Sequence, residues 1–160
     1  MDISFDIYND KGDQIRVVLS YYDTENLQAF TSDPLTQTLL FYDVTFVRIS
    51  GNKMVGVKML KAICDVLFRF MNDNETTVLC FYCDDLTDVS RHNRELTPQE
   101  YRSRLFSRMF DIYVHSNGIT DIVNYGIKIE SGDKPRFAHF ITPEKYLPAI
   151  KLLGNVIMEK

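Results

Sequence analysis

The chain has 160 residues and a mass of 18.7 kDa, the size of one ordinary domain that can bury about two-thirds of its unfolded surface. It is 45% hydrophobic and 25% charged with only 7 Gly and 5 Pro, which excludes collagen-like, low-complexity and wholly disordered classes. A net charge of −4 argues against a general nucleic-acid binder. We therefore predict a single α/β domain over residues 1–160.

Location is predicted from the start of the chain, its apolar runs and its cysteines. Residues 1–6 contain neither the basic nor the apolar segment of a secretion signal. The longest apolar run, residues 78–83, is far shorter than the ~20 residues that cross a bilayer as a helix. Three cysteines, an odd number, favour reduced thiols over a disulfide framework. These features predict a cytoplasmic protein with no membrane segment.

The first part of the chain alternates between apolar and polar residues. Alternation over residues 3–7 and 15–21, around turn-forming residues 9–12, predicts an N-terminal β-hairpin. Residues 23–38 are polar and irregular, with Pro34, and are expected to form a connection, although residues 25–30 could hold one short helical turn. Crowded β-branched and aromatic residues at 39–49 predict a central strand with apolar side chains on both faces.

After residue 50 the spacing of the apolar residues changes from every second residue, typical of a strand, to every third or fourth residue, typical of a helix. Apolar residues at helical spacing predict an amphipathic helix over 55–72, and residues 76–83 read as an apolar strand, so a parallel crossover is expected. After a polar loop at 84–97, the sequence Thr97-Pro98-Gln99-Glu100 predicts a helix start, and Asn117-Gly118 its end. Strands at 122–130 and 136–142 flank a turn, and a last helix runs to Met158 with Pro148 distorting its first turn.

These elements predict an α+β fold. We expect a mixed, mostly antiparallel sheet of about six strands with three main helices, in the order βββαβαββα. The sequences at 83–85, 91–94 and 104–110 resemble an uncharacterised bacterial family of unknown function, which implies no activity. The element order over residues 1–142 also resembles the core of the GNAT acyltransferase superfamily, and that resemblance implies acetyl-CoA as cofactor and N-acyl transfer as activity.

The resemblance to GNAT enzymes implies a pyrophosphate site in the loop after the long strand, where free backbone N–H groups and the helix dipole hold an anion. The corresponding residues are Ser50, Gly51, Asn52, Lys53, Gly56 and Lys58. The alternative is an ordinary tight turn between strand and helix, which the five-residue spacing of the two glycines favours.

The same resemblance places the general acid near Tyr113, because a tyrosine can donate a proton to a leaving thiolate. The alternative is a packing role, since Tyr113 continues the apolar stripe of Tyr101, Leu105 and Met109.

Charged residues gather between the strand at 76–83 and the helix that follows. Three carboxylates suit a divalent cation, but neighbouring Asp84 and Asp85 cannot both face inward from an extended chain, which favours a solvated acidic turn. The arginines suit a phosphate or carboxylate. The candidate partner-binding or anion-binding residues are Asp84, Asp85, Asp88, Arg91, Arg94, Arg104 and Arg108.

Other reactive side chains are predicted to be structural. Cys80 and Cys83 point to opposite faces of a strand and are expected to be core thiols. The three histidines share no ligand spacing or nucleophile context, and His139 is expected to be an ordinary sheet residue. The pattern favours a non-enzymatic binding or interaction module that uses residues 84–108 to bind a protein or small anionic partner. A GNAT-like acyl-CoA-dependent N-acyltransferase, active or degenerate, is the alternative.

Overall fold

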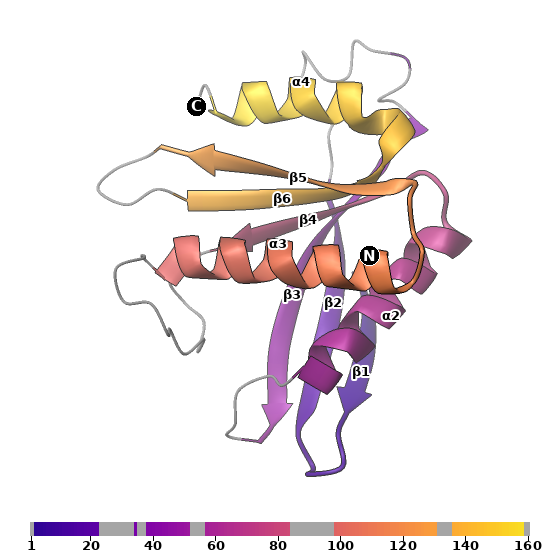
Figure 1. Ribbon diagram of the computed structural model, residues 1–160, viewed down its shortest axis with the longest axis vertical. Helices are drawn as coiled ribbons and strands as arrows, with labels where there is room; N and C mark the ends of the chain where they lie inside the picture. Colours follow the sequence, from indigo (N-terminus) through magenta and orange to yellow (C-terminus); the bar gives the residue numbers. More distant parts are fainter. Residues whose placement is uncertain are drawn as a thin grey trace.

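The computed structural model describes residues 2–22, 34, 38–51, 57–83, 98–130 and 136–158. Among these residues the strands and helices follow one another as expected, and a 3-10 turn precedes the last helix (Figure 1). The elements are β1 (Asp2–Tyr8), β2 (Gln14–Tyr22), β3 (Leu40–Ser50), α2 (Val57–Asp73), β4 (Thr77–Cys83), α3 (Pro98–Ser116), β5 (Ile122–Ile129), β6 (Arg136–Pro143), η2 (Glu144–Tyr146) and α4 (Leu147–Met158).

The strands form one mixed sheet. Its six described strands run in the order β1-β2-β3-β4-β6-β5. Both predicted hairpins are confirmed, with Ile7 opposite Ile15 and Ile129 opposite Arg136. β3 and β4 are parallel, as expected for a strand, helix, strand crossover, and the other neighbouring pairs in this part of the chain are antiparallel. The predicted α+β class is therefore confirmed.

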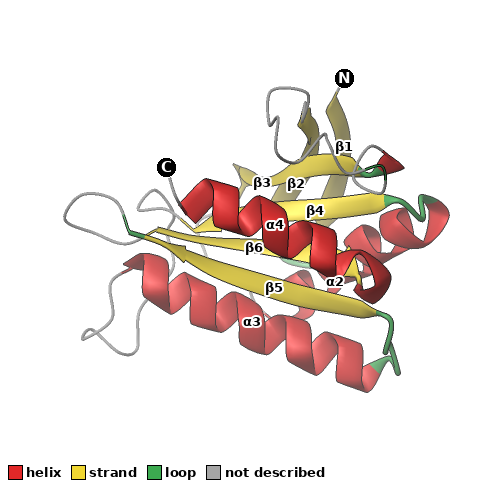
Figure 2. Cartoon of the chain, turned by 90° about the horizontal axis from the view of Figure 1, so that it is seen from above, coloured by secondary structure: helices red, strands yellow, loops and turns green. Residues whose placement is uncertain are grey.

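Helices cover both faces of the sheet, as Figure 2 shows, with α2 and α3 on one side and α4 on the other. Because successive strand residues face opposite sides, the strands supply two separate clusters of buried side chains. The cluster beneath α2 and α3 includes Leu19, Val44 and Phe81. The cluster beneath α4 includes Phe41 and Phe140.

The start of the last helix is irregular, as predicted from the position of Pro148. Residues 144–146 form a 3-10 turn, and α4 starts at Leu147, with Pro148 in its first turn. Proline is tolerated there because the first backbone N–H groups of a helix have no partner within the helix. None of the described helices is long and apolar enough to cross a membrane.

Candidate functional site

The two parallel strands separate at their carboxyl ends. Residue pairing between β3 and β4 covers only Leu40 with Thr77 through Asp43 with Cys80. Beyond that point β3 continues to Ser50 beside β2, and β4 continues to Cys83 beside β6. Figure 1 shows the two arrowheads diverging, with β3 directed to the bottom of the view and β4 to the left. The facing edges of β3 and β4 therefore diverge beyond this pair, and we call the region between these two edges, which side chains of both strands enter, the gap.

A row of rings lines the side of this gap that faces α2 and α3. Phe46 of β3 contacts Phe81 of β4 at 5.9 Å between ring centroids, and Phe81 contacts Phe106 of α3 at 4.5 Å. Phe106 in turn lies 4.9 Å from the ring of His139 on β6. Phe46 is 44% exposed, whereas Phe81 is buried. The row leads from the surface at the gap to a buried imidazole.

A carboxylate and a thiol occupy the opposite side of the same junction. Asp43 and Cys80 form the last residue pair before the strands part, and Cys80 belongs to the cluster beneath α4. Burial raises the pKa of the Asp43 carboxyl. Burial, with Asp43 nearby, raises the pKa of the Cys80 thiol. The apex of the gap thus carries a half-buried carboxylate with increased proton affinity, a feature that recurs at functional sites.

His139 is the centre of a hydrogen-bond network between α3, β5 and β6. Its Nε2 lies 2.9 Å from Ser103 Oγ, and its Nδ1 lies 3.0 Å from Asn124 Oδ1. Asn124 Nδ2 donates to Ser107 Oγ at 3.3 Å, so the Asn124 carbonyl oxygen is the atom that faces the imidazole. Because a carbonyl oxygen only accepts, Nδ1 carries the ring proton and Nε2 accepts the proton of the Ser103 hydroxyl.

Burial keeps this imidazole neutral. His139 is 2% exposed, and burial lowers its pKa from 6.5 to about 4. Gly126 lies opposite His139 in the β5–β6 pair, and a Cβ at Gly126 would stand 3.2 Å from ring atoms Cε1 and Nδ1. Gly126 is exposed, and any larger residue at this position would crowd the His139 ring.

The lowered pKa predicts a pH-dependent stability. In the unfolded chain His139 binds a proton below about pH 6.5, but in the folded protein it does so only near pH 4. Between these two pH values protonation therefore favours the unfolded chain. The contribution of neutral His139 to stability is complete above pH 6.5 and is lost as the pH falls to about 4. We expect a loss of about 3 kcal/mol across that window. Urea unfolding at several pH values, compared with His139→Gln, isolates the effect. Equal pH dependence in both proteins would contradict it.

Ser50 and Gly51 hold the β1–β2 turn against the end of β3. Ser50 Oγ donates to the Gly12 carbonyl at 2.8 Å. Gly51 has φ +99°, and a Cβ there would collide with the carboxylate of Asp13. Of the other residues predicted to hold a pyrophosphate, Lys58 is exposed in the first turn of α2, while Asn52, Lys53 and Gly56 lie outside the described residues.

Tyr113 joins the two helices that share a face of the sheet. Its hydroxyl donates to Asp65 Oδ1 of α2 at 2.6 Å, and its ring lies 4.8 Å from that of Phe68. Burial, and next the hydrogen bond to Asp65, raise the pKa of Tyr113, which strengthens its hold on the proton. The structure thus places Tyr113 in contact with α2, and its predicted role as a general acid stays a prediction.

Arg104 and Arg108 are exposed on α3. Arg104 Nη2 lies 3.2 Å from Glu100 Oε1, one helical turn earlier. The structure therefore places both arginines on one solvent-facing helix. The rest of the predicted binding cluster, namely Asp84, Asp85, Asp88, Arg91 and Arg94, lies outside the described residues.

The cysteines that the structure describes have no feature of a redox or metal site. Cys80 is buried, and burial raises the pKa of Cys64 to about 11, so both thiols stay protonated. Within the described ranges, no group of three or more His, Cys, Asp or Glu side chains could hold a metal ion. The prediction that Cys80 is a core thiol is confirmed.

Comparison with protein-family models, with curated proteins and with solved structures gives no match for this chain. The candidate site is therefore inferred from the geometry of its residues alone.

Two parts of the site were missed by sequence reasoning: the junction at Asp43 and the network around His139. One signal for the network was present. Phe137, His139 and Ile141 alternate along a strand and so share one face of it, which predicts that His139 is buried between two apolar neighbours. A buried polar side chain requires hydrogen-bond partners.

Proposed function

We propose that the protein binds an acyl-coenzyme A, or a similar phosphorylated thioester, along the strand edges where β3 and β4 diverge. The supporting observation is that a parallel pair loses its pairing after Asp43 and Cys80. In open α/β sheets ligands bind outside the carboxyl ends of strands, where neighbouring connections diverge. The β3 edge beyond Asp43 and the β4 edge beyond Cys80 border this gap, and the amides of a pantetheine arm can pair with a strand edge as an added strand does.

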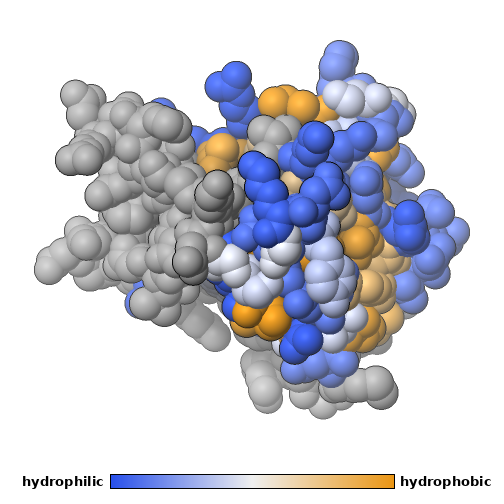
Figure 3. All heavy atoms as spheres, turned by 90° about the horizontal axis from the view of Figure 1, so that it is seen from below, coloured by the Kyte–Doolittle hydropathy of each residue, from blue (hydrophilic) through white to orange (hydrophobic). Residues whose placement is uncertain are grey.

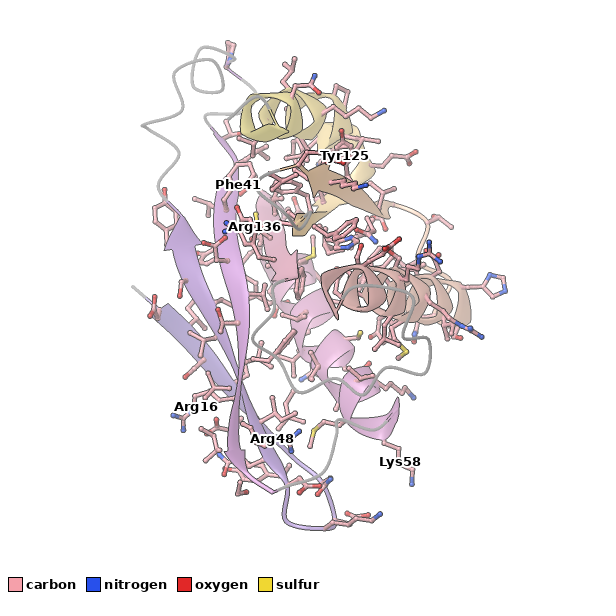
Figure 4. All side chains as sticks on the ribbon, turned by 90° about the vertical axis from the view of Figure 1, so that its left-hand side faces the viewer. Arg16, Phe41, Arg48, Lys58, Tyr125 and Arg136 are labelled. Atoms are coloured by element: carbon pink, nitrogen blue, oxygen red, sulfur yellow. The ribbon has the colours of Figure 1, made fainter. Side chains whose placement is uncertain are left out.

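Charge supports the same placement for the phosphates. Figure 4 shows Arg48 extending from the lower part of β3 toward the side on which α2 lies, and Lys58 at the same end of the molecule on α2. The N-terminus of a helix carries a partial positive charge and favours phosphate. We place the phosphates near the end of β3 and the start of α2, and the acyl end toward the apex at Asp43.

Hydrophobic surface near the gap supports an extended organic ligand in addition to an anion. At the end of β3, Phe46, Val47 and Ile49 are each more than 40% exposed. On the face shown in Figure 3, hydrophobic side chains lie among hydrophilic ones. An apolar stem with a charged terminal group, which is the composition of coenzyme A thioesters, complements a surface of this kind.

The first test is titration calorimetry and thermal unfolding with acetyl-CoA, coenzyme A, pantetheine and 3′,5′-ADP. Acetyl-CoA at 100 times its dissociation constant should stabilise the fold by about 2.7 kcal/mol. Pantetheine and 3′,5′-ADP should each bind more weakly than the whole cofactor, because each retains only one part of it.

Variants locate the site. Arg48→Gln and Lys58→Gln should each weaken acetyl-CoA binding about tenfold, the value of one charged contact near 1.4 kcal/mol. Lys61→Gln, one turn further along α2 and also exposed, is the matched control and should bind normally. The absence of binding at millimolar acetyl-CoA by folded protein would refute the proposal.

A second candidate is the interaction module expected from the sequence, and the exposure of Arg104 and Arg108 on α3 favours it. The same titration separates the two. If Arg104→Gln and Arg108→Gln weaken the binding of 3′,5′-ADP while Arg48→Gln and Lys58→Gln do not, the anion site lies on α3 and the interaction module is the better description.

A further inference from the structure

We infer that Ser103 is a nucleophile toward the activated carbonyl of small esters or thioesters, with His139 as its general base and Asn124 as the residue that orients the imidazole. Nothing in the proposed binding of acyl-coenzyme A requires this reaction, and the inference does not depend on that binding. It rests on the placement of two polar side chains, Ser103 of α3 and Asn124 of β5, at the two nitrogen atoms of the buried His139 ring of β6.

The geometry is that of an activated nucleophile. A general base must lie within about 2.6–3.2 Å of the hydroxyl whose proton it takes, and a third group must fix the base. Ser103 Oγ is 2.9 Å from His139 Nε2, and Asn124 Oδ1 is 3.0 Å from Nδ1. The hydrogen bond from Asn124 to Ser107 fixes the amide, so the ring holds its proton on Nδ1 and directs its lone pair at Ser103.

The surroundings of Ser103 favour a small substrate. Ser103 is half-buried rather than enclosed, and the His139 ring packs closely against Gly126 on its other side. Phe106 packs against the ring at 4.9 Å and supplies an apolar wall. The apolar ring of Phe106 beside the imidazole suits a short acyl chain, and the partial exposure of Ser103 is the observation that allows a substrate to reach it.

The reaction balances with water as the second reactant. Ser103 Oγ bonds to the acyl carbon and passes its proton to His139 Nε2. The bond from the acyl carbon to the alcohol oxygen or thiol sulfur breaks, and that leaving group takes the proton. Water then attacks the acyl-serine and gives a proton to Nε2, the carbon–Oγ bond breaks, and Oγ recovers the proton. The products are a carboxylic acid and an alcohol or thiol.

A fluorophosphonate probe tests the serine directly, because Oγ displaces fluoride from phosphorus and forms a stable adduct. We expect one adduct per chain, mapped by peptide mass spectrometry to Ser103. Ser103→Ala should abolish it, and His139→Gln should slow it about a hundredfold or more, in the range for loss of a general base. Ser116→Ala, an exposed serine near the end of the same helix, is the matched control and should label at the normal rate.

Two further measurements keep a purely structural network distinguishable. Circular dichroism must show that each variant is folded before its rate is compared. Nitrogen-15 NMR of the imidazole in the unaltered protein should show Nδ1 protonated and Nε2 unprotonated at pH 7. Folded, unaltered protein that does not label at Ser103, labelling that survives Ser103→Ala, or the opposite tautomer would overturn the inference. None of these readouts involves coenzyme A, so failure here and failure of the proposed binding are separate results.

Discussion

Replacing Leu153 by alanine is expected to lower the free energy of unfolding by about 2–5 kcal/mol, the range for removing a large aliphatic side chain from a packed core. Leu153 is 2% exposed and packs in the cluster beneath α4 with Ile150 and Phe140. Because α4 covers one face of the sheet, the cavity would weaken the attachment of the helix as well as remove buried area. Urea unfolding followed by circular dichroism measures the change.

The neighbouring residue provides the control. Leu152 is 51% exposed, so Leu152→Ala removes the same atoms from the same helix with little loss of buried surface. We expect its effect to stay within about 0.5 kcal/mol, as for surface substitutions elsewhere. Similar losses in both variants would show that α4 does not present Leu153 to the sheet.

The elements of this fold were predictable because most of them depend on local patterns. The change from a period of two at residues 39–49 to a helical period at 55–72 marks β3 and α2, and the capping sequence at Thr97 marks the start of α3. The parallel pairing of β3 and β4 followed from the helix between them. In each case the information lies within about 20 residues of the element that it defines.

The candidate site depends on contacts between distant residues, which no local pattern contains. Nothing in residues 39–50 indicates that pairing with β4 stops at Asp43, because the register of a parallel pair is set by packing across the sheet. The network of His139 joins residues 36 and 15 positions away, in a helix and a neighbouring strand. The β5–β6 hairpin was predicted, but the position of α3 over it was needed to bring Ser103 to the ring.

One side chain, Phe106, connects the junction of β3 and β4 with the network around His139. Phe106 contacts Phe81, the first residue of β4 beyond its pairing with β3, and also contacts His139. Side chains in a packed interior do not move independently. A ligand that displaces Phe81 in the gap would therefore shift Phe106, and with it the wall beside Ser103.

Gly51→Ala is expected to cost about 2–5 kcal/mol of stability, from backbone strain of about 1–2 kcal/mol and overpacking of about 1–3 kcal/mol. The φ of +99° disfavours any side chain, and the new Cβ would meet the Asp13 carboxylate. Gly12→Ala is the matched control, because its φ of +83° carries the backbone strain while nothing lies within 4 Å of the added Cβ. Urea unfolding should show that Gly51→Ala is the more destabilised of the two.

A double substitution separates the steric part of this cost from the backbone part. Asp13→Ala removes the carboxylate that the new Cβ meets and leaves only Asp13 Cβ, 3.1 Å away, so adding it to Gly51→Ala should recover most of the overpacking cost while the cost of the φ angle stays. Asp13 accepts a hydrogen bond from Asn9 Nδ2 at 2.8 Å, so Asp13→Ala alone must be measured to close the cycle. Additive losses would contradict the contact. Gly51 therefore supports the fold, and a Gly51 variant that loses coenzyme A binding is evidence for a phosphate site only if the variant is shown to be folded. Lys58→Gln is the better probe of that site.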